Sequence, residues 1–277
     1  MKIQYLGTAA AEGIPAVFCE CEVCREAKRR GGKNIRTRSQ AVIDNRILID
    51  FPADTYMHYL KYNFPLSQIH TCIVTHSHSD HLYPEDFAMR KDGFSHIPHK
   101  EPLTIYSGND AYKKITKTIN ESGAVCNDFR SILIMPYEPF YAEGYKITAL
   151  KATHDLKSSP YIYLIEKDGK TLFYANDTSD FPKETWEFLE NYNNKISFVS
   201  LDCTEGDNKM NYSGHMNIER CCKVRDKLFK TCVCGENTIF VLNHFSHNGV
   251  HNLYDEFSII AEKEKFGVTY DGMIVEF

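Results

Sequence analysis

Alternating apolar and polar positions along the chain predict short strands joined by tight turns. Residues 1–7 have the pattern of a first strand. Two hairpins are predicted where β-rich runs flank a short polar turn, at residues 41–44 with 47–50 and at residues 161–166 with 171–174. Further strands are predicted from apolar runs at residues 72–75, 196–201 and 238–242.

Helical periodicity accounts for most of the remaining pattern. Five windows fit a helix, and Pro182 suits the first position of one of them. These windows are residues 53–62, 110–121, 182–192, 218–229 and 253–265. Early hairpins followed by alternating helices and strands predict an α/β protein with two mixed sheets covered by helices.

Composition narrows the class of protein. The chain has 277 residues, of which 43% are hydrophobic and 25% charged, so it can bury a core of its own. We expect one domain over residues 1–277. The net charge of −5 argues against a generic nucleic-acid binder. No apolar run approaches the roughly 18 residues of a membrane span, and the first residues lack a signal-peptide pattern. We therefore expect a cytoplasmic protein without membrane contact.

The strongest chemical signal is the run Thr-His-Ser-His-Ser-Asp-His at residues 75–81, at the end of a predicted strand. Imidazole and carboxylate groups together suit Zn²⁺, Mn²⁺ or Fe²⁺. In an extended segment His76 and His78 point the same way, and a turn then brings Asp80 and His81 to a neighbouring position. One metal could bind the first pair and a second metal the other.

Two metals need more ligands than this run supplies. His154, Asp177 and His244 each follow an apolar run, where loops at one sheet edge can converge. Taken singly, each of the three is more often a structural residue than a ligand.

The run from His76 to His81 matches the H-x-H-x-D-H signature of the metallo-β-lactamase superfamily, which the chain resembles over nearly its whole length. The resemblance implies an αββα four-layer sandwich with a dinuclear site at one edge of the two sheets. It also implies that residues 267–275 form a closing hairpin. The implied ligands are His76, His78 and His154 for one metal, Asp80, His81 and His244 for the other, and Asp177 as the bridge.

Cysteines near the N-terminus predict a separate metal site. Cys19, Cys21 and Cys24 form a C-x-C-x-x-C cluster, and a closed zinc site needs a fourth ligand. This cluster, with His-x-x-His at residues 244–247, resembles the accessory phosphodiesterases of phosphonate breakdown, the C–P lyase pathway. That resemblance implies that His247 completes a structural zinc site. The pyrroloquinoline quinone biosynthesis B proteins share a similar cluster, and reduced surface thiols are the simpler alternative.

His215 precedes the predicted helix at residues 218–229, and Gly214-His215 looks like the general-acid position of the superfamily's phosphodiesterases. Asp202 ends an earlier strand and could accept a hydrogen bond from His215, which would raise the imidazole pKa. A loop histidine without a catalytic task is the alternative.

These features predict a metal-dependent phosphodiesterase with two divalent metal ions, Zn or Mn or else Fe, and one structural Zn. A metal-bridging hydroxide would attack phosphorus, Asp80 would help to orient it, and His215 would protonate the leaving alkoxide. The expected substrate is a small cyclic or linear phosphodiester of the ribosyl cyclic phosphate or nucleotide type, and not a nucleic-acid polymer. Homodimer formation stays a hypothesis.

Two other classes of function remain open. The same metals could hydrolyse a carboxylic ester, thioester or lactam, or the protein could be a non-catalytic cofactor-biosynthesis protein similar to the quinone-biosynthesis B proteins. The transfer-RNA 3′-processing nucleases are further relatives, but the acidic net charge and the lack of a basic arm disfavour that activity.

Some residues receive no firm function. The segment 82–103 is expected to shape the substrate pocket, with His96 and His99 at its edge or in solvent. Cys72, Cys126 and Cys203 are expected to be buried or incidental thiols. A second metal site or a redox pair is a hypothesis for Cys221, Cys222, Cys232 and Cys234.

Overall fold

A computed structural model describes residues 1–98, 100–123, 128–155, 157–209, 214–249 and 251–277. Of the residues considered above, His99 and Cys126 lie outside the described residues. Within the described ranges, every helix is too short or too polar to cross a lipid bilayer.

Within these described ranges, fourteen strands form two sheets of seven. The first sheet has the order β14-β1-β2-β3-β4-β5-β6, antiparallel from β14 to β3 and parallel from β3 to β6. Its strands are β1 (Lys2–Gly7), β2 (Gln40–Ile43), β3 (Ile47–Ile49), β4 (Thr71–Val74), β5 (Leu103–Ser107), β6 (Phe129–Leu133) and β14 (Ile274–Glu276).

The second sheet has the order β13-β12-β11-β10-β9-β8-β7, antiparallel from β7 to β10 and parallel from β10 to β13. Its strands are β7 (Pro139–Ala142), β8 (Tyr145–Lys151), β9 (Tyr161–Lys167), β10 (Lys170–Ala175), β11 (Phe198–Asp202), β12 (Ile239–Asn243) and β13 (Gly267–Val268). Both predicted hairpins, β2–β3 and β9–β10, are confirmed.

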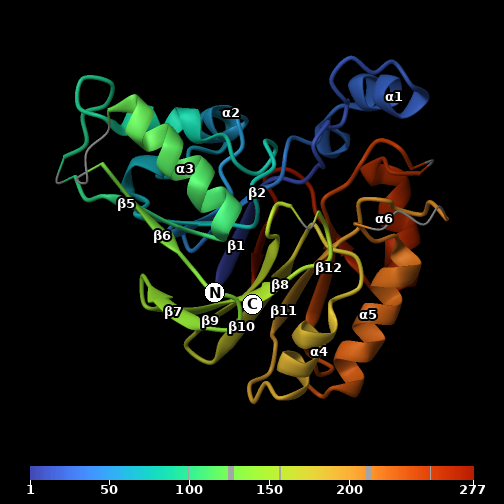
Figure 1. Cartoon of the computed structure of the whole chain (residues 1–277). Coiled ribbons are helices and arrows are strands. Elements are labelled where there is room, and N and C mark those ends of the chain that lie inside the picture. The colour runs from blue at the N-terminus through green and yellow to red at the C-terminus, as the bar shows by residue number, and fades with distance from the viewer. Residues whose placement is uncertain (99, 124–127, 156, 210–213, 250) are drawn as a thin grey trace.

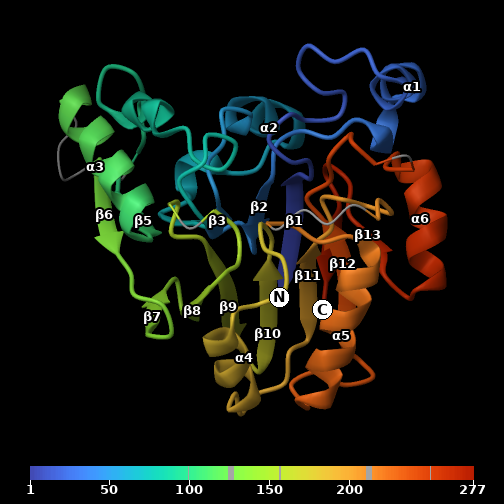
Figure 2. The same ribbon diagram turned by 45° about the vertical axis from the view of Figure 1, so that its right-hand side comes forward.

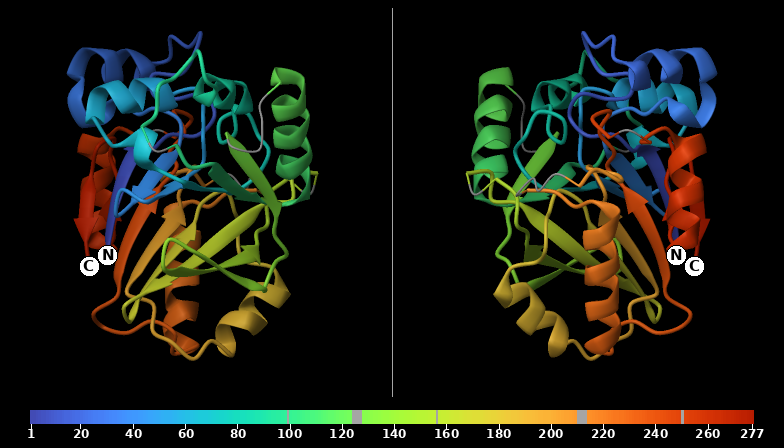
Figure 3. Two further views of the ribbon diagram at one scale, coloured as in Figure 1. Left: turned by 90° about the vertical axis from the view of Figure 1, so that its left-hand side faces the viewer. Right: turned by 90° about the vertical axis from the view of Figure 1, so that its right-hand side faces the viewer.

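Helices cover the outer faces of the sheets (Figure 1). α2 (Thr55–Tyr62) and α3 (Asn109–Ser122) lie on one side of the two sheets, and α4 (Lys183–Glu190) and α5 (Ile218–Lys230) lie on the other (Figure 3). α6 (Tyr254–Lys263) packs beside α5, whereas α1 (Glu22–Arg30), which no sequence window predicted, stands near the Cys cluster. This arrangement confirms the αββα sandwich.

Apolar side chains explain why these layers stay together. Ile43 and Tyr5 of the first sheet pack with Ile147 and Phe198 of the second in a fully buried core between the sheets. On the outer face of the second sheet, α5 buries positions spaced three or four residues apart, the spacing that keeps side chains on one helix face. These are Ile218, Cys221, Val224 and Leu228.

The predicted closing hairpin at residues 267–275 is wrong. β13 pairs with β12 in the second sheet, whereas β14 pairs with β1 in the first. The connection between them is held to the first sheet, because the Gly272 amide donates to the Tyr5 carbonyl at 2.7 Å and the Asp271 carboxylate accepts from Thr8 and Thr37. The chain therefore crosses between the sheets at this point.

Strand direction places several loops at the same end of the sandwich (Figure 2). β8, β10, β11 and β12 run the same way, since β8 and β10 are both antiparallel to β9 and the last three are parallel. In the first sheet β3 and β4 are also parallel. The carboxyl ends of parallel strands share one sheet edge, where binding sites in α/β proteins collect.

Candidate metal centre

The loop after β4 turns back on itself. The amides of His81 and Leu82 both donate to the His78 carbonyl, at 3.1 and 2.8 Å. The Thr75 amide at the start of the loop donates to the Asp50 carboxylate at 2.7 Å. This turn brings the second half of the predicted motif beside the first.

One group of imidazoles lies on the β8 side of the loop. His154 Nε2 lies 3.3 Å from His78 Nδ1, and the His76 ring centre lies 4.5 Å from that of His78 and 5.1 Å from that of His154. One nitrogen of each ring lies within 4.8 Å of the others. These are the three residues predicted to share one metal.

A second group forms on the β12 side. His81 Nε2 lies 3.2 Å from both His244 Nε2 and an Asp80 carboxylate oxygen. Asp80, His81 and His244 are all buried. They are the three residues predicted to share the other metal.

Asp177 lies between the two groups. Its carboxylate oxygens are 3.2 Å from His81 Nε2, 3.3 Å from His244 Nε2 and 3.9 Å from His154 Nε2. The structure thus brings all seven predicted ligands together, with the Asp177 carboxylate next to imidazoles of both groups.

The chemistry of these residues fits divalent cations. His76 Nε2 is buried and has no hydrogen-bond partner among the described residues, a situation that normally costs about 1–3 kcal/mol. Burial lowers the pKa of His76 and of His154, which favours the neutral imidazoles that bind metals. Burial alone would raise the pKa of Asp177, but the charges of His244 and His81 lower it well below its usual range.

Asp202 and His215 adjoin the cluster but face each other. His215 Nδ1 lies 2.8 Å from Asp202 Oδ2. The Asp202 carboxylate also accepts from the amides of Asp177, Thr204 and Met216, each at 3.0 Å. Because both Asp202 oxygens accept these hydrogen bonds, the carboxylate is held in place and can orient His215. Burial disfavours the charged imidazole, yet the Asp202 charge and hydrogen bond raise the pKa of His215 to about 9.

Sequence reasoning missed the residues that hold the ligands in place. Asp50 lies 2.7 Å from His81 Nδ1, Asp155 lies 3.2 Å from His78 Nε2, and Thr204 Oγ1 lies 2.8 Å from His244 Nδ1. Such partners orient ligand imidazoles and increase their basicity. A signal was present in the sequence, since Asp50 directly follows β3 and Asp155 directly follows a predicted ligand.

Three residues of the site that follow strands share an unusual backbone conformation. Asp50, Asp177 and His244 have φ angles of 66°, 51° and 65°. This left-handed region is uncommon for residues other than glycine, although Asp, Asn and His enter it more readily than most. Each strand thus ends in a sharp turn that points a polar side chain into the cluster.

A cavity of about 670 Å³ opens over the cluster. The ligands His78, Asp80, His154, Asp177 and His244 line it together with His215. The polar residues Glu12, Glu205, Asn208, Ser246 and Asn248 also line it. No described residue of segment 82–103 lines this cavity, so the expectation that this segment shapes the pocket is wrong. Leu82, Phe87 and Leu103 of this segment pack instead in the apolar cluster on the outer face of the first sheet.

The Cys cluster forms around His247, in the loop after β12. His247 Nδ1 lies 3.5 Å from Cys19 Sγ and 3.4 Å from Cys21 Sγ, and the Ala16 amide donates to Cys24 Sγ at 3.2 Å. One ligand atom of each of Cys19, Cys21, Cys24 and His247 lies within 4.8 Å of the others. The four residues predicted to bind structural zinc are therefore adjacent.

The cysteines of this cluster would repel one another as thiolates unless a cation bound them together. Burial opposes ionisation of Cys21, but hydrogen bonds from His247 and the Cys24 backbone lower its pKa to about 6. Burial and the nearby Cys21 and Cys19 thiols raise the pKa of Cys24 to about 12. A divalent cation would stabilise several thiolates at once, which is the chemistry of a structural zinc site.

Cys21→Ser is expected to lower thermal stability and soluble yield, because a structural zinc contributes folding free energy. A thousandfold loss of zinc affinity would remove about 4 kcal/mol, or roughly 10 °C of melting temperature. Turnover per folded molecule should stay largely intact. Thermal unfolding and zinc content check this, with Cys232→Ser as the control at an exposed thiol. A Cys21→Ser protein with normal stability and normal zinc content would exclude the structural site.

The remaining cysteines do not extend this chemistry. Cys221, Cys222, Cys232 and Cys234 join no metal-binding group among the described residues. Cys221 and Cys234 are buried, Cys222 is half-buried and Cys232 is exposed, and all four are free thiols. Their role stays unassigned.

Comparison with known families adds to this geometry. The family profile described as the Beta-lactamase superfamily domain matches residues 45–235, which is more than half of the chain. The matched range contains His76 to His81, His154, Asp177 and His215, whereas His244 and the Cys cluster lie outside it.

Solved structures share the fold at low sequence identity. Zn²⁺-bound PqqB from Methylobacterium extorquens has a TM-score of 0.78 at 18% identity over 100% of both chains. A diphosphatase from the PhnP family has a TM-score of 0.74 at 16% identity over 100% of this chain and 97% of that chain. Human tRNase Z, short form, has a TM-score of 0.68 at 17% identity over 100% of this chain and 99% of that chain.

A curated relative matches over a shorter stretch. An octanoyltransferase of Porphyromonas gingivalis is 33% identical over 84 residues. This stretch is 30% of the present chain, and it covers 16% of the length of that relative. The likeness therefore concerns one segment of a much longer protein.

Proposed function

Because the chain belongs to the β-lactamase superfamily, we propose that it is a metal-dependent hydrolase and that it hydrolyses a small phosphodiester. The observation that carries this proposal is the pairing of His215 with Asp202 beside the cluster of seven ligands. A buried imidazole held by a carboxylate at a hydrolytic site suits the protonation of a poor leaving group.

We assign the metal ligands as the geometry groups them. His76, His78 and His154 would hold one cation, Asp80, His81 and His244 would hold the other, and Asp177 would contact both. Divalent cations bound there would supply a water of lowered pKa and would neutralise negative charge on a phosphate group. Asp50, Asp155 and Thr204 keep the imidazoles in position through the hydrogen bonds described above.

His215 is assigned as the general acid. Its ring centre lies 4.7 Å from that of His154 and 5.5 Å from that of His244, so it faces the pocket from beside both metal positions. Because Nδ1 bonds to Asp202, proton transfer would run through Nε2. Asp202 fixes the ring orientation and stabilises the protonated imidazole, and Asp80 is placed to orient the attacking water.

The pocket favours a small substrate with few negative charges. Glu12 and Glu205 line the same cavity as the ligands, and Ser246 donates a hydrogen bond to Glu12. Carboxylates there would repel the successive phosphates of a nucleic acid and accept hydrogen bonds from substrate hydroxyls. A ribosyl cyclic phosphate or a nucleotide-type diester fits these groups. We propose that the protein acts on this small molecule in the cytoplasm, without a polymer or membrane partner.

The test is an activity panel with added Mn²⁺, Zn²⁺ or Ni²⁺. Cyclic ribonucleotides and bis-nitrophenyl phosphate represent phosphodiesters, and an aryl ester, a thioester and a chromogenic β-lactam represent the alternative hydrolases. Metal-dependent turnover of the phosphodiesters alone is expected. Preference for a thioester or lactam would replace the proposed function, and absence of any turnover in metal-loaded protein would favour a non-catalytic role.

Metal content is a further prediction of these assignments. The gently purified or reconstituted protein should contain three metal ions per chain, one in the Cys cluster and two at the His/Asp cluster. Elemental analysis before and after treatment with a thiol-reactive probe would distinguish the metal of the Cys cluster from the two metals of the His/Asp cluster. Only the metal of the Cys cluster depends on the cysteines. A maximum of one metal per chain after reconstitution would contradict the assignment.

A further inference from the structure

A second cavity, of about 400 Å³, lies on the outer face of the first sheet. It opens between the short helical turns η2 (Leu66–Gln68) and η3 (Pro84–Arg90), and Leu103 of β5 and Tyr59 of α2 also line it. It shares no lining residue with the cavity over the metal ligands. Its volume lies within the range of about 300–1,000 Å³ that is common for small-molecule sites.

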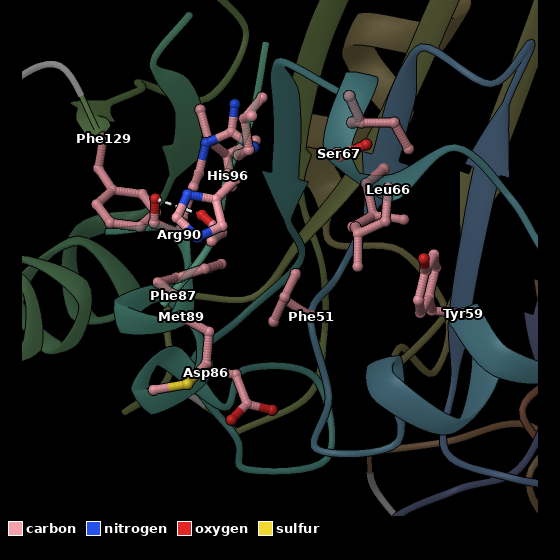
Figure 4. A pocket seen from close by; sticks show the side chains of 15 residues that line it. Phe51, Tyr59, Leu66, Ser67, Asp86, Phe87, Met89, Arg90, His96 and Phe129 are labelled. Carbon is pink, nitrogen blue, oxygen red and sulfur yellow. Dashed lines mark hydrogen bonds between the residues drawn. The ribbon is translucent and has the colours of Figure 1, made fainter. Parts of the chain in front are cut away.

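Most of this cavity is apolar. Phe51, Leu66, Ile69, Phe87 and Phe129 contribute apolar side chains, and the rings of Phe51 and Phe87 are 4.6 Å apart. Figure 4 shows Phe87 and Phe129 on one side and Leu66 and Tyr59 on the other, with Phe51 between them. An apolar body would be removed from water on entering this space.

Arg90 places a cationic group on the cavity wall. Its Nη2 donates to the Glu101 carbonyl at 2.7 Å, whereas its buried Nε has no hydrogen-bond partner among the described residues. Among the described residues, Arg90 forms no ion pair within 4.0 Å, although the charge of Asp128 acts on it. Asp128 forms its own ion pair with Lys100. The guanidinium is thus held by the Glu101 carbonyl and keeps an unused Nε donor among the described residues.

Asp86 limits the number of negative charges that a molecule bound in this cavity can carry. Asp86 lines the same cavity and in Figure 4 lies beside Met89, away from Arg90 and His96. If the bound molecule had a second anionic group near Met89, the Asp86 carboxyl would repel it. A single anionic group beside Arg90 would avoid this repulsion. Carboxylates pair well with guanidinium groups because both are planar and can form two parallel hydrogen bonds.

We propose that this cavity binds a monocarboxylate with an apolar body, whose carboxylate pairs with Arg90 while its body packs against Phe51, Phe87 and Phe129. The site is separate from the metal centre and does not depend on the proposed function.

Calorimetric titration of the metal-loaded protein with hexanoate, octanoate and decanoate tests this site. Affinity should rise about fourfold with each added methylene until the cavity is filled, as expected for about 0.8 kcal/mol per buried methylene. Octan-1-ol, which lacks the charge, should bind more weakly than octanoate by roughly 10- to 100-fold, the value of a charge-assisted hydrogen bond. No binding of any carboxylate at millimolar concentration would overturn the proposal.

Variants locate the bound molecule. Arg90→Gln should lose roughly 10- to 100-fold in octanoate affinity, whereas Arg130→Gln, at an exposed arginine next to Phe129, should not. Ser67→Trp fills the cavity from an exposed position and should abolish binding without unfolding the chain. Binding that survives both Arg90→Gln and Ser67→Trp but disappears on chelation of the metals would place the carboxylate at the metal centre and overturn the assignment.

Discussion

His215→Ala is expected to slow hydrolysis of an alkyl phosphodiester by roughly 10²- to 10⁴-fold, the usual value of general acid–base assistance. The same variant should lose much less on a nitrophenyl diester. An alkoxide is too basic to leave without a proton, whereas nitrophenolate leaves readily. The ratio of the two losses therefore reports on proton donation and not on general damage to the site.

The measurement is kcat/KM for both substrates, together with metal content, in the wild type and the variant. His251→Ala is the matched control. Like His215, His251 pairs with an aspartate, Asp207, but this pair is exposed and does not line the pocket. Equal losses on both substrates would show that His215 has a role other than protonation of the leaving group. Loss of metal would instead make His215 a ligand.

Asp177→Ala is expected to abolish phosphodiesterase activity and to weaken both metals of the His/Asp cluster. Its carboxylate alone lies next to His81, His244 and His154, so its removal affects both groups. Changes to the residues that merely orient metal ligands typically cost about 10- to 100-fold. Loss of the bridge should therefore reduce turnover to below roughly a hundredth of the wild-type value.

Backbone strain needs its own control in this experiment. Alanine at position 177 must keep a positive φ angle, which destabilises the chain independently of metal binding. Asp168, at the other end of β10, is exposed and has φ of 49°, close to the 51° of Asp177. Asp168→Ala should therefore show the strain with normal metal content and activity. Unchanged turnover and two retained metals in Asp177→Ala would remove Asp177 from the ligand set.

Local patterns were sufficient for the positions of the ligands and for many of the strands, but β5, β6 and β7 were not predicted. His76 to His81 is a contiguous run, and the residues at positions 154, 177 and 244 each follow a strand whose apolar pattern is clear. The grouping of these residues into two sets came from family resemblance, because spacing along the chain does not specify distances across two sheets.

The errors arose where tertiary contacts override local pattern. The turn containing Asp271 and Gly272 reads as a hairpin, yet hydrogen bonds to Thr8, Thr37 and Tyr5 draw it to the first sheet. Segment 82–103 follows the ligand loop directly, but its apolar residues Phe87 and Leu103 pack in a buried cluster that contains none of the metal ligands. The orienting residues Asp50 and Thr204 were missed because their partners lie far away along the chain.

The left-handed conformation at Asp50, Asp177 and His244 limits how this centre can be redesigned for another metal. A softer ion would call for Cys, and a harder one for an additional Glu. At positions 177 and 244, either substitution would replace a residue type that tolerates positive φ with one that tolerates it less well. Altered metal preference is therefore easier to engineer at His76, His78 or His154, none of which has a positive φ angle.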